Sequence, residues 1–429
     1  MTMRLEPAKE DAAWEDKWSL PTTLARARAL AENPGQEFSK FSAVLQNLLG
    51  RSTTVIEPLA PEDIAEAFCI PVLTDTPEHQ AHDTLVSRVT DLTRAGSWSV
   101  LAEDITGWDQ NRRAFASGKR YTATASVAAM TAMMHESSNL DEDETGPISE
   151  TVLHSLVKAQ EADPQNYVLA GLLARAHIHN GWVSHGSIPT EAIKRRDASS
   201  MEERFREAAG LLDHFNPIER NSPFLAETRY KLLPAFVDAD RFLIDWFEDW
   251  RDLDPFALAP HALQGYYLLP RWYGTYERIE AEAVRSTNPM HDGLEAGAYA
   301  AFYLQALDAD PKLASHVDAP LFLTGLDEIA THYKSDPILV NMLLAWFCLD
   351  FKPKRSAAGK FENSTVSKMV KGRKFFATRH LSAIVPGLWR GGEEVAFREL
   401  GKIFANEIAA GEVAQVSGPG LRFGNPVRA

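Results

Sequence analysis

The carboxylates whose spacing best suits chemistry are Asp245 and Asp249, one helical turn apart, with Glu248 beside them. Two such groups can act as a general acid and a general base when burial raises the pKa of one of them. Here they alternate with Trp246 and Trp250, which form the apolar face of the same segment, so the acids are expected to face water. We favour a solvated acidic face and keep an all-helical enzyme with a dispersed carboxylate site as an alternative.

Patterns for metal binding are incomplete. The acidic run 141–146 matches the start of an EF-hand calcium loop, but position twelve, where a bidentate glutamate is required, is Val152. His177 and His179 would project about 200° apart on one helix. No third ligand accompanies them in the sequence. We therefore predict no metal site and no cofactor.

Motifs for a nucleophile are also missing. The sequence has no Gly-x-Ser-x-Gly elbow, and the glycine pair at 391–392 lacks the lysine and serine of a phosphate loop. Cys69 and Cys348 lie far apart in apolar stretches, where buried thiols are expected instead of a disulfide or a catalytic cysteine. We predict no catalytic residue.

An aromatic cluster around Arg271 is the strongest candidate for recognition. Tyrosine, tryptophan and arginine dominate interface hot spots because each combines a broad contact area with a polar group. The residues predicted to contact a protein or peptide partner are Arg271, Tyr267, Tyr273 and Tyr276. Packing between helices is the competing interpretation, and it is favoured for Trp272 because Phe236 occupies the matching position of a related segment.

A basic segment supports a different hypothesis. Residues 352–380 carry nine positive charges and one negative charge, so they contribute +8 to a chain whose net charge is -15, and the rest sums to -23. The cations predicted to bind an anion are Lys371, Arg373, Lys374 and Arg379. With Phe375 and Phe376 between them they suit an anionic surface or nucleic acid. We favour a solvated loop or docking on the protein's own acidic surface, because an acidic body repels phosphate.

These candidates depend on helices to position them. Large apolar residues recur at i, i+3, i+4 and i+7, which places them on one helical face. One such stripe comprises Leu243, Trp246, Phe247 and Trp250. Aspartate can cap free helix amides and proline tolerates the first helical position, so Asp-Pro pairs indicate helix starts. These pairs are Asp163-Pro164, Asp254-Pro255, Asp310-Pro311 and Asp336-Pro337.

A weak internal repeat joins some of these helices. Residues 230–236 match residues 266–272 at an offset of 36, and residues 384–389 echo the same order of apolar residues, proline and aromatic residue. Each copy predicts a helix that ends before a proline. The offset, with residues 169–175 leading to 180–182, resembles the tetratricopeptide-like helical-repeat proteins over about residues 98–350. More narrowly, the Leu-Leu-Pro-Arg-Trp segment resembles a bacterial family of unassigned function.

The resemblance implies a scaffold that binds a partner, without catalytic residues. We therefore predict an all-α protein whose irregular helix pairs stack as a tetratricopeptide-like α-solenoid. The predicted regions are short N-terminal helices (1–97), a helical-repeat domain (98–351), a basic loop with C-terminal helices (352–416) and a flexible tail (417–429). The apolar stretch 338–351 falls short of the roughly 20 residues needed to cross a bilayer, and the first residues do not form a signal peptide. We expect a cytoplasmic location.

Overall fold

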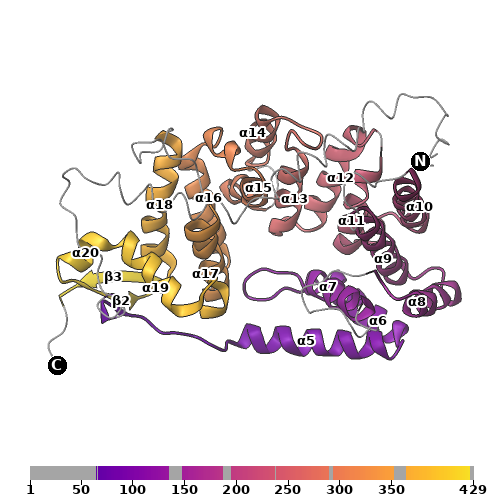
Figure 1. The fold of residues 1–429 in the computed structure, drawn as a ribbon, viewed down its shortest axis with the longest axis horizontal. Helices are drawn as coiled ribbons and strands as arrows, with labels where there is room; N and C mark the ends of the chain where they lie inside the picture. Colours follow the sequence, from indigo (N-terminus) through magenta and orange to yellow (C-terminus); the bar gives the residue numbers. More distant parts are fainter. Residues whose placement is uncertain are drawn as a thin grey trace.

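The fold is mostly helical, as the apolar spacing predicts. A computed structural model describes the chain at residues 64, 66–134, 147–186, 195–236, 238–288, 293–351 and 364–425, without the side chains of 184–186, 195–200 and 364. Within this part the strands are short and join in one three-stranded sheet. Figure 1 shows the helices arranged as an arch above a base formed by the first described helices.

The base of the arch comprises α5 (Pro77–Arg94), α6 (Trp98–Gln110) and α7 (Tyr121–Met134). The first side of the arch comprises α8 (Glu150–Ala162), α9 (Tyr167–Gly186), α10 (Arg195–Leu212), α11 (Pro223–Tyr230) and α12 (Asp240–Leu253). The middle comprises α13 (Leu258–Tyr267), α14 (Tyr276–Arg285), α15 (Ala296–Ala309) and α16 (Ala319–His332). The other side comprises α17 (Pro337–Ala345), α18 (Ser364–His380), α19 (Gly392–Ile403) and α20 (Ala405–Ala409). Short 3-10 or π-helical turns are η2 (Leu233–Ala235), η3 (Pro311–Ser315), η4 (Trp346–Asp350) and η5 (Pro386–Leu388).

Two of the four Asp-Pro pairs begin a helix as predicted. The carboxylate of Asp336 accepts the first free amides of α17, and that of Asp310 accepts the amide of Lys312 in η3. Asp163 ends α8, and Asn166 caps α9 in its place. Asp254 is buried and binds Arg120 from the base instead of capping α13.

Glycines allow the middle helices to approach closely. A methyl group at Gly265 of α13 would lie 1.9 Å from the carbonyl oxygen of Phe302 in α15. A methyl group at Gly325 of α16 would lie 2.1 Å from the carbonyl oxygen of Ala296, also in α15. Because any side chain would force these backbones apart, α15 is held tightly between α13 and α16.

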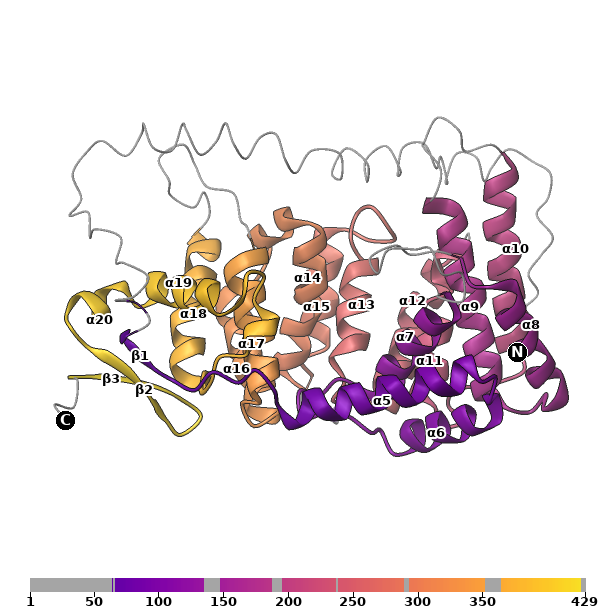
Figure 2. The ribbon, with the colours of Figure 1, turned by 60° about the horizontal axis from the view of Figure 1, so that its bottom comes forward.

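Residues 66–76, which we call the N-terminal strap, connect the C-terminal hairpin of the described chain with its first long helix, α5. Its strand β1 (Phe68–Cys69) pairs in parallel with β2 (Val413–Ser417), which forms a hairpin with β3 (Gly420–Gly424). The strap then runs along the side of the arch to α5 (Figure 2). Phe68 packs against the rings of Phe397, Phe404 and Phe423 at centroid distances of 5.9, 6.2 and 6.4 Å.

The hairpin corrects the prediction of a flexible tail at 417–429. Residues 417–425 form the turn and second strand of the hairpin, and residues 426–429 lie outside the described part. Gly418 adopts a positive φ of 64° at the turn, and Leu421 is buried against the core. The glycines and proline that suggested fraying therefore form a tight turn.

A loop across the arch, residues 111–120, ties the base to the middle helices. It projects from α7 towards the other side of the arch (Figure 1). At its tip Ser117 donates from its amide to Glu78 at 2.8 Å, and Gly118, with φ 89°, sits against the ring of Tyr333. At its end Arg120 forms a bidentate ion pair with Asp254. The inner side of the arch is thus partly filled by the chain itself.

The predicted region boundaries do not separate independent bodies. The boundary at 97/98 falls between α5 and α6, which pack on each other and on α7. The boundary at 351/352 precedes α18, which packs on α16. The helices predicted in the C-terminal region are present, but those predicted within 1–63 and the loop at 352–360 lie outside the described residues. No helix in the described part of the chain is sufficiently long and apolar to cross a bilayer.

Candidate functional site

Arg271 lies on the surface, in the turn that follows α13. Its side chain is exposed, and its guanidinium lies over the ring of Tyr266 at 4.8 Å from the centroid. This stacking restricts the side chain before any partner arrives, and a restricted side chain loses less entropy on binding. Trp272 beside it is half-buried and packs edge-on against Trp182 at 6.5 Å, so the packing interpretation is confirmed for that residue.

The three tyrosines predicted to accompany Arg271 are turned inward to different degrees. Tyr267 is 7% exposed and packs against Tyr230 at 5.5 Å, so its prediction as a contact residue is wrong. Its ring is surrounded by those of Tyr230, Tyr266, Trp272 and Tyr273, which leave no room for a partner. Tyr273 is half-buried, and its hydroxyl is buried without a partner. Tyr276 is half-buried and donates to Asp310 at 2.5 Å; burial, then this bond, raises its pKa to about 12.

The predicted anion-binding residues lie together on α18, but two of them already have acidic partners. Lys374 forms an ion pair with Glu407 of α20, and Arg379 pairs with Asp327 of α16 at 2.8 Å. These contacts fit the interpretation that the basic segment docks on the protein's own acids. Arg373 donates to the carbonyl of Val370 at 3.0 Å, and Lys371 is exposed.

The carboxylates of α12 do not form an acid–base pair. Asp245 is exposed, as a solvated acidic face requires. Asp249 is half-buried, and burial raises its pKa while the charge of Arg229 opposes that rise. Arg229 also lies over Trp246, 4.6 Å from the ring centroid. Asp249 alone meets the burial condition for acid–base work and Asp245 lies on a solvated acidic face, so the dispersed carboxylate site stays an alternative.

A Ser-His-Asp relay appears where the sequence offered no nucleophile motif. The Ser335 hydroxyl lies 2.8 Å from Nδ1 of His380, and Nε2 of the same ring lies 2.8 Å from Asp327. Ser335 has a positive φ of 52° in the turn between α16 and α17. Hydrolases use the same three residue types, in the same order of contact, to activate a serine.

The surroundings of the relay do not support hydrolysis. Ser335 is 7% exposed, which leaves little room for a substrate. The amides of Ser335 and Asp336 donate to the carbonyls of Ala330 and Tyr333, at 2.6 and 3.0 Å. The first amides of α17 donate to the Asp336 carboxylate. Every amide of the turn is therefore engaged, and none remains to stabilise an oxyanion. The relay instead fastens α18 to the turn between α16 and α17.

Two further buried carboxylates, not predicted from the sequence, also join helices. Asp109 of α6 accepts hydrogen bonds from the hydroxyls of Tyr167 and Ser222 at 3.0 and 2.5 Å, and burial raises its pKa. Glu227 of α11 lies between Arg175 and Lys231. Burial alone would raise the pKa of Glu227, but the two cations outweigh it and hold the pKa at about 2. Both acids have their oxygens occupied by internal partners.

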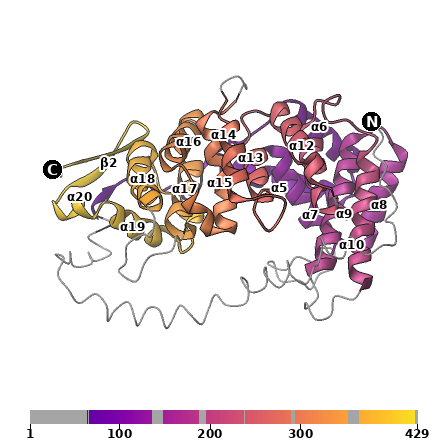
Figure 3. The same cartoon turned by 90° about the horizontal axis from the view of Figure 1, so that it is seen from above.

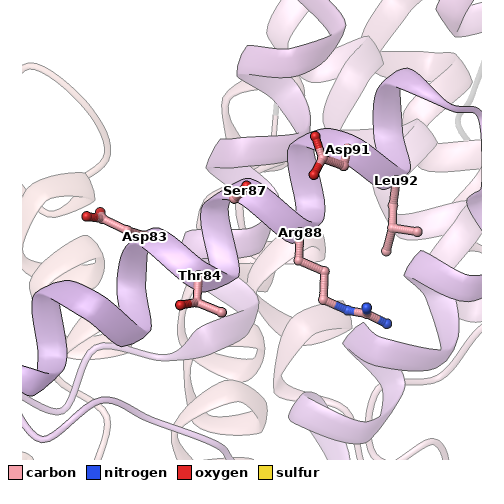
Figure 4. Close-up of a pocket in the computed structure, with 6 residues that line it drawn as sticks. All are labelled: Asp83, Thr84, Ser87, Arg88, Asp91 and Leu92. Carbon is pink, nitrogen blue, oxygen red and sulfur yellow. The ribbon is translucent and has the colours of Figure 1, made fainter.

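The hollow that the described part of the chain does show lies apart from these residues. A hollow on the outer side of α5 is lined by Asp83, Thr84, Ser87, Arg88, Asp91 and Leu92 (Figure 4). All of these residues come from one helix, and Figure 4 shows Asp83 and Arg88 pointing in different directions. Arg88 is engaged by Asp104 at 2.6 Å. A hollow on one side of a single helix does not surround a ligand.

No metal centre is visible in the described residues either. Nowhere in that part of the chain do three or more histidine, cysteine, aspartate or glutamate side chains gather as metal ligands. His177 instead contacts Glu207 at 2.8 Å. The acidic run 141–146 lies outside the described residues. Of the two cysteines, Cys69 is exposed in β1, contrary to the prediction, whereas Cys348 is half-buried.

Comparisons of the chain with protein-family models, with curated proteins and with solved structures found no match. The functional argument therefore depends on the geometry described above. The internal networks were missed in the sequence because their members are far apart: Ser335 and His380 are separated by 45 positions and Asp109 and Ser222 by 113. The sequence signal for the first was the Ser-Asp-Pro cap, which marks the turn but not its histidine.

Proposed function

We propose that this chain is a non-catalytic helical-repeat scaffold that binds a protein or peptide partner. In this proposal α8 to α18 form irregular helix pairs stacked as an α-solenoid of tetratricopeptide-like kind. The internal repeat and the apolar spacing of the sequence motivate this proposal, and the arrangement of the helices supports it. Its cytoplasmic location stays a prediction.

The order of helix contacts supports stacking of successive units. α9 packs on α10 and α11, α13 packs on α12 and α15, and α16 packs on α15 and α18. Figure 3 shows the same row from above, from α10 at one end to α18 at the other. In a solenoid each repeat contacts only its neighbours, which gives this order. The first two copies of the internal repeat also agree, since α11 and α13 both end shortly before the proline of the motif.

The observation that carries the binding proposal is the exposed Arg271 held over Tyr266. Most other polar groups that the sequence or the fold singles out are engaged by internal partners, as the preceding contacts describe. An arginine that is exposed and already stacked combines broad contact with five hydrogen-bond donors at low entropic cost. We therefore place partner contact at Arg271, with Tyr273 and Tyr276 as supporting residues of the same turn.

The test is affinity capture from native extract with the wild-type chain, Arg271→Glu and a control variant. Arg206→Glu is the control, because Arg206 is also exposed and, among the residues that the structure describes, forms an ion pair only with Glu202 of its own helix. We expect a specific protein to be retained by the wild type and by the control, and to be depleted roughly tenfold or more by Arg271→Glu, as a hot-spot loss above 1.4 kcal/mol implies.

Two results would contradict the proposal. One is equal retention of every captured protein by the wild type and Arg271→Glu. The other is covalent labelling of Ser335 by a fluorophosphonate probe, located by peptide mass spectrometry, since a reactive serine would make the relay with His380 catalytic.

A further inference from the structure

One face of α18 carries a continuous exposed row, which we call the basic stripe. It comprises Lys368, Lys371, Phe375 and Arg379, all exposed and spaced by three or four residues. Their spacing places them on one side of the helix, beside the buried face that carries Val366, Met369 and Phe376. At a rise of 1.5 Å per residue the stripe extends over roughly 16 Å. It is long enough for several side chains of a bound peptide.

The cations of the stripe differ in their contacts: the two lysines have no acidic partner among the described residues, and the arginine is held by one. Neither Lys368 nor Lys371 forms an ion pair with another residue that the structure describes. The Arg379 guanidinium is fixed by Asp327 and lies 5.8 Å from the ring centroid of Phe375. Phe375 itself is 51% exposed, in contrast to the buried Phe376 beside it. The stripe thus combines two free ammonium groups with an accessible aromatic ring.

The charge of the rest of the chain decides which kind of anion fits. Residues 364–380, which form α18, contribute +5, and the remainder of the chain contributes -20. At physiological ionic strength charges are screened over about 8 Å. A narrow ligand along Lys368 and Lys371 therefore meets these two cations more than the acidic body, whose acids at α18, Asp327 and Glu407, are already paired with Arg379 and Lys374. A flat bilayer or a nucleic-acid duplex would be brought against both.

We propose that the basic stripe docks an acidic peptide segment of a partner protein. This inference rests on the proposed scaffold function and specifies the chemistry of its partner. Carboxylates one helical turn apart pair with Lys368 and Lys371, and an apolar side chain on the Lys371 side of the pair packs on Phe375. Arg379, held in place by Asp327, completes the aromatic contact.

The experiment measures binding of a fluorescein-labelled peptide of roughly a dozen residues, rich in glutamate with a central leucine, by fluorescence anisotropy. The full chain is compared with Lys368→Glu combined with Lys371→Glu, with Phe375→Ser and with Arg94→Glu. Arg94 is an exposed cation at the far end of α5, so its reversal is the control for a charge change away from the stripe. Circular dichroism verifies that each variant remains folded.

We expect the double charge reversal to raise Kd roughly tenfold or more and to weaken the salt dependence, because two charge pairs are lost. Phe375→Ser should raise Kd severalfold, and Arg94→Glu by less than about twofold, since Arg94 lies on α5 and not on α18. Absence of wild-type binding at low salt, or equal loss in Arg94→Glu, would overturn the proposal. Stripe-dependent binding to phosphatidylserine vesicles without peptide binding would overturn it in favour of a membrane.

The outcome also separates this inference from the scaffold proposal. If the native partner is lost by Arg271→Glu but retained by the double charge reversal, the scaffold function stands and the basic stripe is not its docking site.

Discussion

Asn341 joins α17 to the segment that precedes η5 through a fully buried amide. Its nitrogen donates to the carbonyls of Pro337 and Ala383, each at 2.8 Å. Its oxygen accepts from the amide of Val385 at 3.1 Å and from the indole of Trp389 at 2.8 Å. Every hydrogen-bonding position of the side chain is used, so its removal leaves several buried groups without partners.

We expect Asn341→Leu to destabilise the protein by about 3 kcal/mol or more, since each orphaned buried group costs about 1–3 kcal/mol. Urea denaturation followed by circular dichroism measures this change. Met342→Ala is the control, because Met342 is 46% exposed and its truncation should change stability far less. Similar losses for the two variants would contradict the account of the amide.

His261 gives the protein a predictable response to acid. Its ring packs between Phe247 and Phe302 at 5.4 and 5.6 Å, and burial, followed by the charge of Arg251, lowers its pKa from 6.5 to about 3. The folded state therefore binds this proton less readily than the unfolded chain. Its contribution to stability is complete above pH 6.5 and is lost as the pH falls towards 3, by up to about 1.4 kcal/mol per pH unit.

Replacement of His261 by leucine should flatten this response. We expect the free energy of unfolding of the wild type to fall more steeply than that of His261→Leu between pH 6.5 and 4.5, with a difference of about 2 kcal/mol. Urea titrations at successive pH values measure it, with the exposed His214→Leu as control. Parallel curves for His261→Leu and the wild type would show that the buried ring is not responsible.

At the scale of elements, the close contacts of α15 make the middle helices sensitive to a single methyl group. Gly265→Ala would place that group 1.9 Å from a backbone oxygen, so the helices must separate. We expect a loss of about 3 kcal/mol, at the upper end of the cost of overpacking. Gly107→Ala in α6 meets nothing within 4 Å and should stabilise by about 0.5–1 kcal/mol, because alanine favours a helix. Equal thermal shifts would refute the close packing.

The helical elements could be predicted from the sequence because the apolar residues of each helix face are close together in the sequence. For example, Leu243, Trp246 and Phe247 are three or four residues apart, and all three are buried in α12 as expected. The hairpin was missed because its short strands combine exposed positions such as Gln415 and Val416 with a glycine and proline turn. Its Phe423 packs against Phe68, which is more than 300 positions away and whose contact no local pattern encodes.

The candidate site was predicted only in part for a related reason. The composition of the Arg271 cluster identified residues suited to recognition, and Arg271 is exposed as that role requires. Composition does not determine which side of α13 faces the core, so Tyr267 was placed wrongly. The predicted cations of the basic segment all lie on α18, but the pairing of Lys374 with Glu407 and of Arg379 with Asp327 depends on the packing of α18 against other helices.

At the scale of the whole molecule, the N-terminal strap couples the two ends of the described chain. The amide of Ala414 in β2 donates to the carbonyl of Ala67 at 2.8 Å, beside the ring of Phe68. We expect Phe68→Ala to speed hydrogen exchange at Ala414 and across β2 and β3, because the strap then opens more often. Val416→Ala, on the exposed side of β2, is the control and should leave exchange unchanged. Unchanged exchange in Phe68→Ala would mean that the hairpin is stable without the strap.

The scaffold proposal is tested most directly by titration calorimetry of the purified captured partner against the wild type and Arg271→Glu. The account predicts binding to the wild type at a defined stoichiometry, and an increase in Kd of roughly tenfold or more in Arg271→Glu, equivalent to about 1.4 kcal/mol. Identical affinities for the two proteins would contradict the claim that the exposed turn after α13 recognises the partner.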